Sequence, residues 1–347
     1  MFYFLIIFEM TLYLILLCSK LNNKKKTFLT ISFFVLTILL GLRNMSVGID
    51  TAAYSVVYNG YLKTKKFLMF DSIHLENILD YEILFYYSVF LFSKIGLSFT
   101  IYNLFYSIIV VGAFIKLIEK YSNNYFLSVL IFILTLYPFT FSSMRQSFAI
   151  AFCLISFMLY YDDKKYFFIF YLIAILFHKT ALIFFPMYFI KKIDFNKATF
   201  VVFILLGILA LVFRNDLIMF FNENSRSSYN VVGISGLATT LYRFIVLFAC
   251  IFLYYVCGDK NKIYIITAYI SFLVMCIMNF NPTTFRTVYY FSSFEIIIIP
   301  WIFNHFKNTF EKYVLVAICV LFLFLPFYQT ISPNANKLNN YKFTQII

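Results

Sequence analysis

The chain contains few of the residues that break helices or hold metal ions. Its 347 residues include 9 glycines, 6 prolines, 6 cysteines and 3 histidines, and no stretch is rich enough in glycine and proline to form a linker. The cysteines are scattered, mostly within apolar runs, and show no CxxC or Cys/His spacing of a zinc site. They are interpreted as small core residues. We therefore expect no metal site and no cofactor.

Apolar residues dominate the composition. They make up 63% of the chain, with a mean hydropathy of +0.87, whereas about half of an ordinary soluble domain is apolar. The apolar stretches fall at about 2–18, 27–42, 83–93, 98–118, 125–141, 142–160, 166–190, 198–213, 239–257, 263–279, 286–303 and 313–329. Because a spanning helix needs about 20 apolar residues, they predict an all-α polytopic membrane protein with about 10–13 transmembrane or re-entrant helices. Residues 1–347 would form a single integral membrane domain.

The net charge of +13 comes from lysine, which occurs 22 times, whereas arginine occurs only six times. The lysines cluster between apolar segments, which is typical of cytoplasmic loops rather than of a nucleic-acid-binding surface. These clusters are Lys24–Lys26, Lys164–Lys165, Lys191–Lys192 and Lys260/Lys262. Residues 1–18 contain Glu9 and lack a basic leader and a small-residue cleavage site, so we expect a retained first helix.

Two polar stretches, 43–82 and 214–238, are long enough to be functional loops. Placing Lys24–Lys26 in the cytoplasm puts both stretches outside. The middle of the chain then poses a problem, because five apolar segments separate Lys26 from Lys164 and an even number is required. Segment 83–93 is too short to span comfortably and is a candidate re-entrant helix. Segment 166–190 fits the charge rule if it forms a helical hairpin with His178 near the turn.

The placement of four arginines differs from that of the lysines. Arg43, Arg145 and Arg286 flank the ends of apolar segments, and Arg243 lies a few residues inside one. A guanidinium binds phosphate oxygens through two parallel hydrogen bonds. Arginines converging from separate helices would therefore bind phosphate or pyrophosphate. Alternatively, each one anchors a helix end at the lipid headgroups.

Asp50 lies in VGIDTAAY, directly after an apolar segment, and allows two interpretations. Its carboxylate could act as a general base towards a hydroxyl group. It could equally cap a helix that begins at Thr51. Glu82, in DYEILFYY, is either functional or simply the last acid before an apolar run.

His178 is the only histidine inside a long apolar stretch. It is either a hydrogen-bonded packing residue or, at a hairpin apex, a general base or pyrophosphate ligand. Glu295 is an acid within an apolar segment, and pairing with an arginine would explain it. Tyr54, Tyr58 and Tyr61 follow helical spacing and could stack on sugar rings or form part of an aromatic belt.

Five passages together resemble those of the EpsG-type, Wzy-like bacterial polysaccharide polymerases. They are collinear with that family's motifs over about residues 40–300. DYEILFYY has Ile83 where the family commonly has proline, which leaves the role of Glu82 open. The passages are GLRNMSVGIDTAAY, DYEILFYY, SMRQSFAIAF, AILFHKTALIFFPMYFI and FRTVYYFSSFEIIIIP.

The resemblance implies a GT-C-like membrane fold and polymerisation of undecaprenyl-pyrophosphate-linked oligosaccharide repeats for capsule or exopolysaccharide. The growing glycan would pass to an acceptor sugar hydroxyl at the external face of the bacterial cytoplasmic membrane. Asp50 and His178 are then the candidate catalytic residues. The candidate pyrophosphate- and sugar-binding residues are Arg43, Tyr54, Glu82, Arg145, Gln146, Arg243 and Arg286.

The expected partners are the lipid-linked oligosaccharides, the bilayer, and a chain-length regulator and flippase of the same pathway. A flippase or transporter is the main alternative function, but it would show midplane charges, broken helices and repeated halves. A membrane acyltransferase that modifies surface glycans is the third, because it also relies on a membrane histidine.

Overall fold

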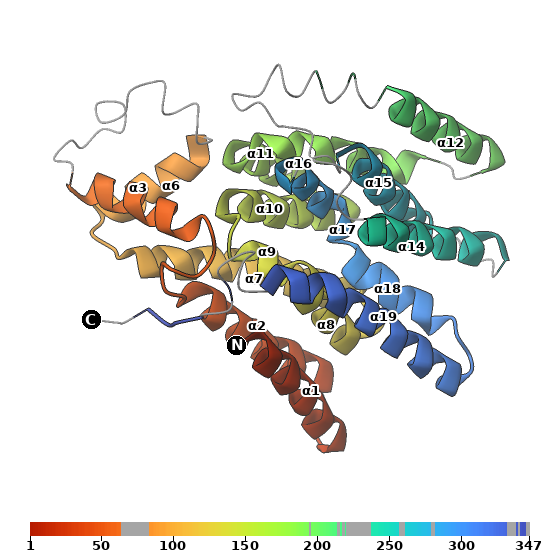
Figure 1. Cartoon of the computed structure of the whole chain (residues 1–347), viewed down its shortest axis with the longest axis horizontal. Coiled ribbons are helices and arrows are strands. Elements are labelled where there is room, and N and C mark those ends of the chain that lie inside the picture. Colours follow the sequence, from red (N-terminus) through yellow and green to blue (C-terminus); the bar gives the residue numbers. More distant parts are fainter. Residues whose placement is uncertain are drawn as a thin grey trace. The chain divides into compact units, whose positions relative to one another are not determined.

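The computed structural model describes residues 1–63, 83–193, 196–213, 216, 219, 237–256, 261–278, 282–331, 338 and 341–344 (Figure 1). Within these ranges the chain is helical, and its β-structure is one isolated bridge between Arg43 and Phe343. The all-α prediction is therefore confirmed for the described residues. The chain divides into two compact units, Met1–Leu182 with Phe303–Ile347, and Ile183–Ile302. That both belong to one membrane domain stays a prediction.

Ten helices of the first unit are described. Three of them, α7, α10 and α19, are apolar enough and at least 18 residues long, as a membrane crossing requires. Most of the other helices are apolar but shorter than 18 residues. Helix length alone does not test the predicted number of membrane crossings. The helices are α1 (Phe2–Cys18), α2 (Lys24–Gly41), α3 (Thr51–Lys63), α6 (Ile83–Lys94), α7 (Phe99–Tyr121), α8 (Tyr125–Thr135), α9 (Tyr137–Thr140), α10 (Met144–Tyr161), α11 (Phe167–Phe177) and α19 (Thr309–Ile331).

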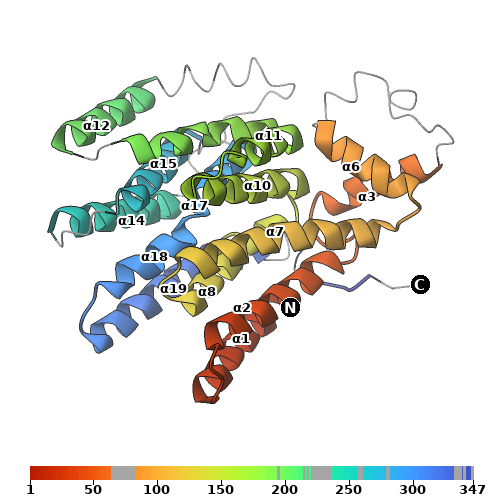
Figure 2. The same ribbon diagram turned by 180° about the vertical axis from the view of Figure 1, so that it is seen from behind.

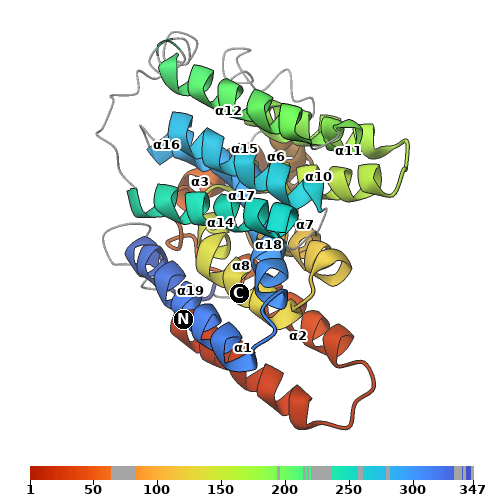
Figure 3. The same cartoon turned by 90° about the vertical axis from the view of Figure 1, so that its right-hand side faces the viewer.

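Contacts between helix ends define a lysine end of the first unit. Lys25 donates a hydrogen bond to the carbonyl of Glu119 over 2.7 Å, so α2 begins where α7 finishes. Lys120 pairs with Asp162, which places the end of α10 there as well. Figure 3 shows α1 and α2 as a helical pair joined by a short turn. Helices α1, α7 and α10 therefore finish at the lysine end, and α2 begins there.

The opposite end of this unit is the arginine end, where Arg43 follows α2. The Arg43 guanidinium lies 5.7 Å from the ring centre of Tyr106 in α7 and 5.6 Å from that of Phe141, between α9 and α10. Phe2 at the start of α1 packs against Phe141 and against Phe327 of α19. Both the first residues of α1 and the last turns of α19 therefore lie at the arginine end.

Helix α6 packs against α3, with the ring of Phe85 in its first turn 5.2 Å from that of Tyr54. Lys94 at its last turn donates to the carbonyl of Tyr61 in α3, and the Tyr58 hydroxyl donates to the carbonyl of Leu97 just beyond α6. Figure 2 shows α3 and α6 beside the first half of α7. Four helical segments, α2, α7, α8 with α9, and α10, then run between the ends from Lys26 to Lys164. An even number of crossings is what the charge rule requires between these two lysine clusters, and the re-entrant character of segment 83–93 stays a prediction.

The second unit contains the helices between Ile183 and Ile302. Its longer helices are apolar, and Lys262 at the start of α15 donates to the carbonyls of Lys191 and Ile193. The described elements are the 3₁₀ segment η1 (Lys179–Lys192), which begins in the first unit, then α12 (Lys197–Val212), α14 (Leu237–Val256), α15 (Lys262–Met278), α16 (Pro282–Phe285), η2 (Arg286–Val288), α17 (Tyr289–Ser292) and α18 (Glu295–Asn304).

Candidate active site

The loop between α2 and α3 carries the first motif passage and packs onto the turn before α10. The Ile49 amide donates to the Ser142 side chain over 3.3 Å, and the Thr51 hydroxyl donates to the Phe141 carbonyl over 3.1 Å. Gly48 has φ of +90°, and a Cβ atom there would lie 2.1 Å from the Phe141 carbonyl oxygen. This position therefore requires glycine, both for its backbone conformation and for the close approach of the two segments.

Arg43 is buried in this loop, with an exposed fraction of 1%. Its Nη1 donates to the carbonyl of Leu40 in the last turn of α2, and its Nε lies 3.5 Å from the Thr51 hydroxyl oxygen. Burial lowers the pKa of the guanidinium from its ordinary value, and electrostatic interaction with Tyr106 and other tyrosines opposes the shift. Arg43 thus joins the end of α2 to the start of α3. Its Nη2 is buried without a hydrogen-bond partner among the described residues.

Asp50 is the residue immediately before α3, and its carbonyl accepts the first helical hydrogen bond, from the Tyr54 amide, over 3.1 Å. The helix start predicted from the sequence is confirmed, so Asp50 occupies the capping position. Its side chain is half-buried. Because Ile49 contacts Ser142, the N-terminus of α3 lies beside that of α10, which begins at Met144. Both helix dipoles favour negative charge there.

Arg145 and Gln146 occupy the first turn of α10, so both lie at this junction of helix starts. Arg145 is half-buried and Gln146 is almost fully buried. Arg145 is therefore the more accessible arginine of the pair Arg43 and Arg145. A guanidinium beside two helix N-termini adds to the positive potential that would attract phosphate oxygens.

His178 interrupts the segment 166–190 between α11 and η1. It has an extended backbone, and its Nδ1 accepts hydrogen bonds from the Thr180 amide over 3.3 Å and from the Thr180 hydroxyl over 2.9 Å. A ring nitrogen that accepts an amide hydrogen cannot carry a proton itself. The neutral imidazole therefore has its proton on Nε2, which makes it a hydrogen-bond donor towards a ligand. This state suits phosphate or hydroxyl binding better than proton abstraction.

Packed aromatic rings bring the three motif passages together. Tyr106 of α7 contacts Arg43 and lies 5.0 Å from Phe148 of α10. Phe148 stacks on Phe177 at 4.5 Å, and Phe177 precedes His178. Phe148 lies one helical turn beyond Arg145, so the passages containing Arg43, Arg145 and His178 meet at the arginine end. The sequence reasoning did not identify Tyr106, since nothing in its local pattern distinguishes it from the other tyrosines.

Tyr54 is buried in α3, and its ring packs against Phe85 at 5.2 Å. Its phenol group also interacts electrostatically with Arg43. Tyr58 and Tyr61 are likewise buried, so the helical spacing of the three tyrosines marks the packed face of α3. With their rings covered, none of the three offers a free face to a sugar in this conformation.

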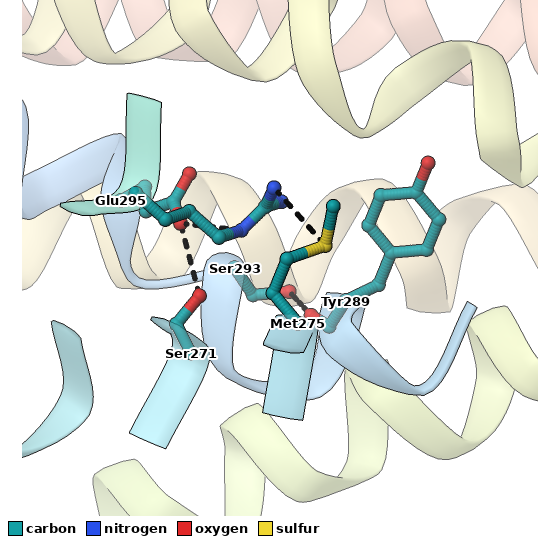
Figure 4. A network of polar contacts seen from close by, with 6 residues as sticks. Ser271, Met275, Tyr289, Ser293 and Glu295 are labelled. Carbon is teal, nitrogen blue, oxygen red and sulfur yellow. Dashed lines mark hydrogen bonds and ion pairs between the residues drawn. The ribbon is translucent and has the colours of Figure 1, made fainter. Parts of the chain in front are cut away.

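The second unit holds Arg243 and Arg286. Arg243 forms a buried ion pair with Glu295 over 3.2 Å. Figure 4 shows Ser271 beside the same carboxylate, to which its hydroxyl donates over 3.0 Å. The predicted pairing of Glu295 with an arginine is therefore confirmed. Tyr289 interacts electrostatically with both Arg243 and Arg286, so the two arginines share one neighbour. Arg243 also lies 3.8 Å from the Met275 sulfur.

The structure assembles only part of the predicted site within one unit. Arg43, Asp50, Arg145, Gln146 and His178 belong to the first unit, together with Tyr54. Arg243 and Arg286 belong to the second unit. Glu82 lies outside the described residues. Sequence reasoning also missed the contact of Thr51 with Arg43 and Phe141, although Thr51 stands in the motif that drew attention to Asp50.

The sequence model of the EpsG family matches residues 26–343, which is nearly the whole chain. The chain therefore belongs to the EpsG family and is a membrane protein with a role in polysaccharide biosynthesis. No curated protein and no solved structure matches it significantly.

Proposed function

We propose that the chain polymerises oligosaccharide repeats linked to undecaprenyl pyrophosphate, at the external face of the bacterial cytoplasmic membrane, for capsule or exopolysaccharide. A GT-C-like architecture belongs to the same proposal. The observation that carries it is the meeting of the three motif passages around two helix N-termini, with Arg145, Asp50 and His178 in the first unit. This arrangement combines anion binding with a carboxylate, as glycosyl transfer from a pyrophosphate requires.

In the proposed reaction, a hydroxyl oxygen of the acceptor sugar attacks the anomeric carbon of the growing glycan. A new C–O bond forms, the bond from the anomeric carbon to the pyrophosphate oxygen breaks, and undecaprenyl pyrophosphate leaves. The Asp50 carboxylate takes the hydroxyl proton. Arg145 and the two helix N-termini stabilise the negative charge that develops on the leaving group.

The residues divide into those that contact substrate and those that support them. Arg145 and His178 are half-buried at the arginine end and would bind the pyrophosphate or a sugar hydroxyl. Arg43 is enclosed, so its proposed task is to hold the loop that carries Asp50. Arg243 and Arg286 remain candidates for binding pyrophosphate, and Gln146 and Glu82 for contacting sugar.

The test is deletion of the gene followed by gel analysis of lipid-linked glycans. Single repeats should accumulate in the deletion strain, and the wild-type gene should restore long chains. Restoration by the Arg145→Lys variant should be nearly as poor as by Arg145→Ala, because lysine cannot form two parallel hydrogen bonds to phosphate. Long glycans in the deletion strain would contradict the proposal, and a loss of all external lipid-linked repeats would instead indicate a flippase.

A further inference from the structure

Four residues near the end of the chain pair with the loop that carries the candidate site. Asn44 donates its amide hydrogen to the Lys342 carbonyl over 2.7 Å, and Thr344 donates its amide hydrogen to the Leu42 carbonyl over 2.8 Å. These bonds flank the antiparallel bridge between Arg43 and Phe343. We call Tyr341–Thr344 the strap.

Side chains of the strap add two hydrogen bonds to the same region. The Thr344 hydroxyl donates to the Arg43 carbonyl over 2.8 Å, and the Tyr341 hydroxyl donates to the Leu39 carbonyl over 2.7 Å. Burial raises the pKa of Tyr341 above its ordinary value, with Arg43 opposing the shift, so the phenol stays protonated and able to donate at neutral pH.

The strap supplies partners that α2 lacks by itself. The last carbonyls of a helix have no intrahelical donor. In α2, the carbonyl of Leu39 accepts from Tyr341, that of Leu40 from Arg43, and that of Leu42, just past the helix, from Thr344. The strap and the Arg43 guanidinium therefore cap one helix end together.

We propose that the strap is a positioning element of the polymerase, which fixes the Arg43 loop and through it the Asp50 carboxylate. The inference rests on the proposed function, since Asp50 is only seven residues beyond Arg43 in the same loop. Arg43 is held on its backbone by Thr344 and through its side chain by Leu40 and Thr51. Releasing the backbone would let the loop move relative to the start of α10, where Arg145 lies.

The structural part of the proposal is tested by amide hydrogen exchange of the purified protein in detergent or nanodiscs. Deletion of residues 341–347 should remove the protection of the Asn44 amide, whereas the matched deletion of 345–347 should preserve it. Equal exchange of Asn44 in both truncated proteins would overturn the strap. This readout requires no enzymatic activity, so it stands or fails separately from the proposed function.

The positioning part is tested by polymerisation of lipid-linked repeats in vitro. Deletion of 341–347 should lower kcat about 100-fold, because a displacement of about 1 Å at a reacting group has that effect, with little change in KM. Thr344→Val and Tyr341→Phe should each lower kcat less, and the control Lys342→Gln should be neutral, since only the Lys342 backbone takes part. Unchanged kcat after loss of Asn44 protection would overturn the positioning role. If the full chain itself forms no polymer, the proposed function fails instead.

Discussion

Single residues at the arginine end have chemical roles that follow from their partners. The N-cap position of Asp50, the two hydrogen bonds to Nδ1 of His178 and the burial of Arg43 each limit what these side chains can do. Asp50 is left as the stronger candidate base, because the His178 nitrogen that could take a proton already accepts two hydrogen bonds. The roles of Asp50 and His178 can be distinguished by substitutions that preserve the hydrogen bonds of each side chain and remove its ability to take a proton.

Asp50→Asn is expected to abolish chain growth while the protein still inserts and lipid-linked single repeats accumulate. Asparagine caps a helix about as well as aspartate but has no basic oxygen, so the start of α3 should persist. Loss of a general base lowers the rate by about 100- to 10,000-fold. The measurement is the rate of polymer formation per molecule of inserted protein. Normal-length polymer from this variant would show that Asp50 acts only as a cap.

His178→Asn is expected to retain more activity than His178→Ala. Asparagine offers both an oxygen that can accept from Thr180 and an amide that can donate to a ligand, whereas alanine offers neither. Loss of a hydrogen bond to a charged ligand should lower the rate by about 10- to 100-fold in the alanine variant. Equal and complete inactivity of both variants would favour an imidazole base, and the same assay of polymer formation distinguishes the two outcomes.

At the scale of elements, the site depends on the close approach of the α2–α3 loop to the turn before α10. Gly48 permits this approach, and Thr51, Ile49 and Ser142 supply the hydrogen bonds. The second unit has its own buried contact, the ion pair of Arg243 in α14 with Glu295 in α18. Each contact can be broken by one substitution.

Gly48→Ala is expected to displace the loop and lower both stability and activity. The left-handed backbone costs alanine about 1–2 kcal/mol, and the clash with the Phe141 carbonyl adds to this. The matched control is Gly60→Ala, in the interior of α3, where a Cβ atom would meet nothing within 4 Å. The control should be neutral or stabilise by up to about 1 kcal/mol. Thermal unfolding in detergent measures both, and equal melting temperatures would contradict the tight approach.

Glu295→Gln is expected to destabilise the protein by about 3–5 kcal/mol, because it leaves the buried Arg243 charge without its counter-ion. The double variant Arg243→Met with Glu295→Leu should regain most of that stability, since the apolar pair needs no compensation. Denaturation in detergent reports the stability, and polymer formation reports the function. A stable but inactive double variant would indicate that Arg243 contacts substrate in addition to pairing.

At the scale of the whole molecule, the lysine and arginine ends of the first unit predict the orientation in the membrane. Single cysteines at Ser46 and Lys342, in a cysteine-free background, should react with an impermeant maleimide on intact cells. Cysteines at Lys25 and Lys164 should react only after lysis. The opposite labelling of all four cysteines would invert the orientation and place Asp50 in the cytoplasm. Labelling of the cysteines at 46 and 342 from different sides of the membrane would contradict the strap.

Much of the site could be anticipated because its residues stand in short motifs. The positions of Asp50 and Arg145 at segment ends follow from local hydropathy, which sets where helices begin and finish. His178 lies inside an apolar stretch, and only the charge rule suggested a turn there. The burial of Arg43 and Tyr54 could not be anticipated, since it depends on which faces α7 and α6 present to them. The sequence predicted that Glu295 pairs with an arginine, because a carboxylate in an apolar environment requires a partner. Which arginine it pairs with could not be predicted, since that depends on how the helices pack.

The sequence by itself determined that this is a helical membrane protein of the EpsG family, because apolar length and collinear motifs are local properties of the chain. Only the tertiary structure decided that α6 packs against α3, that Thr51 and Ser142 join two helix starts, and that Tyr341–Thr344 pair with residues 39–44. Such contacts join residues 39 to 302 positions apart in the chain. They arise from the packing of whole helices, which no local pattern of residues specifies.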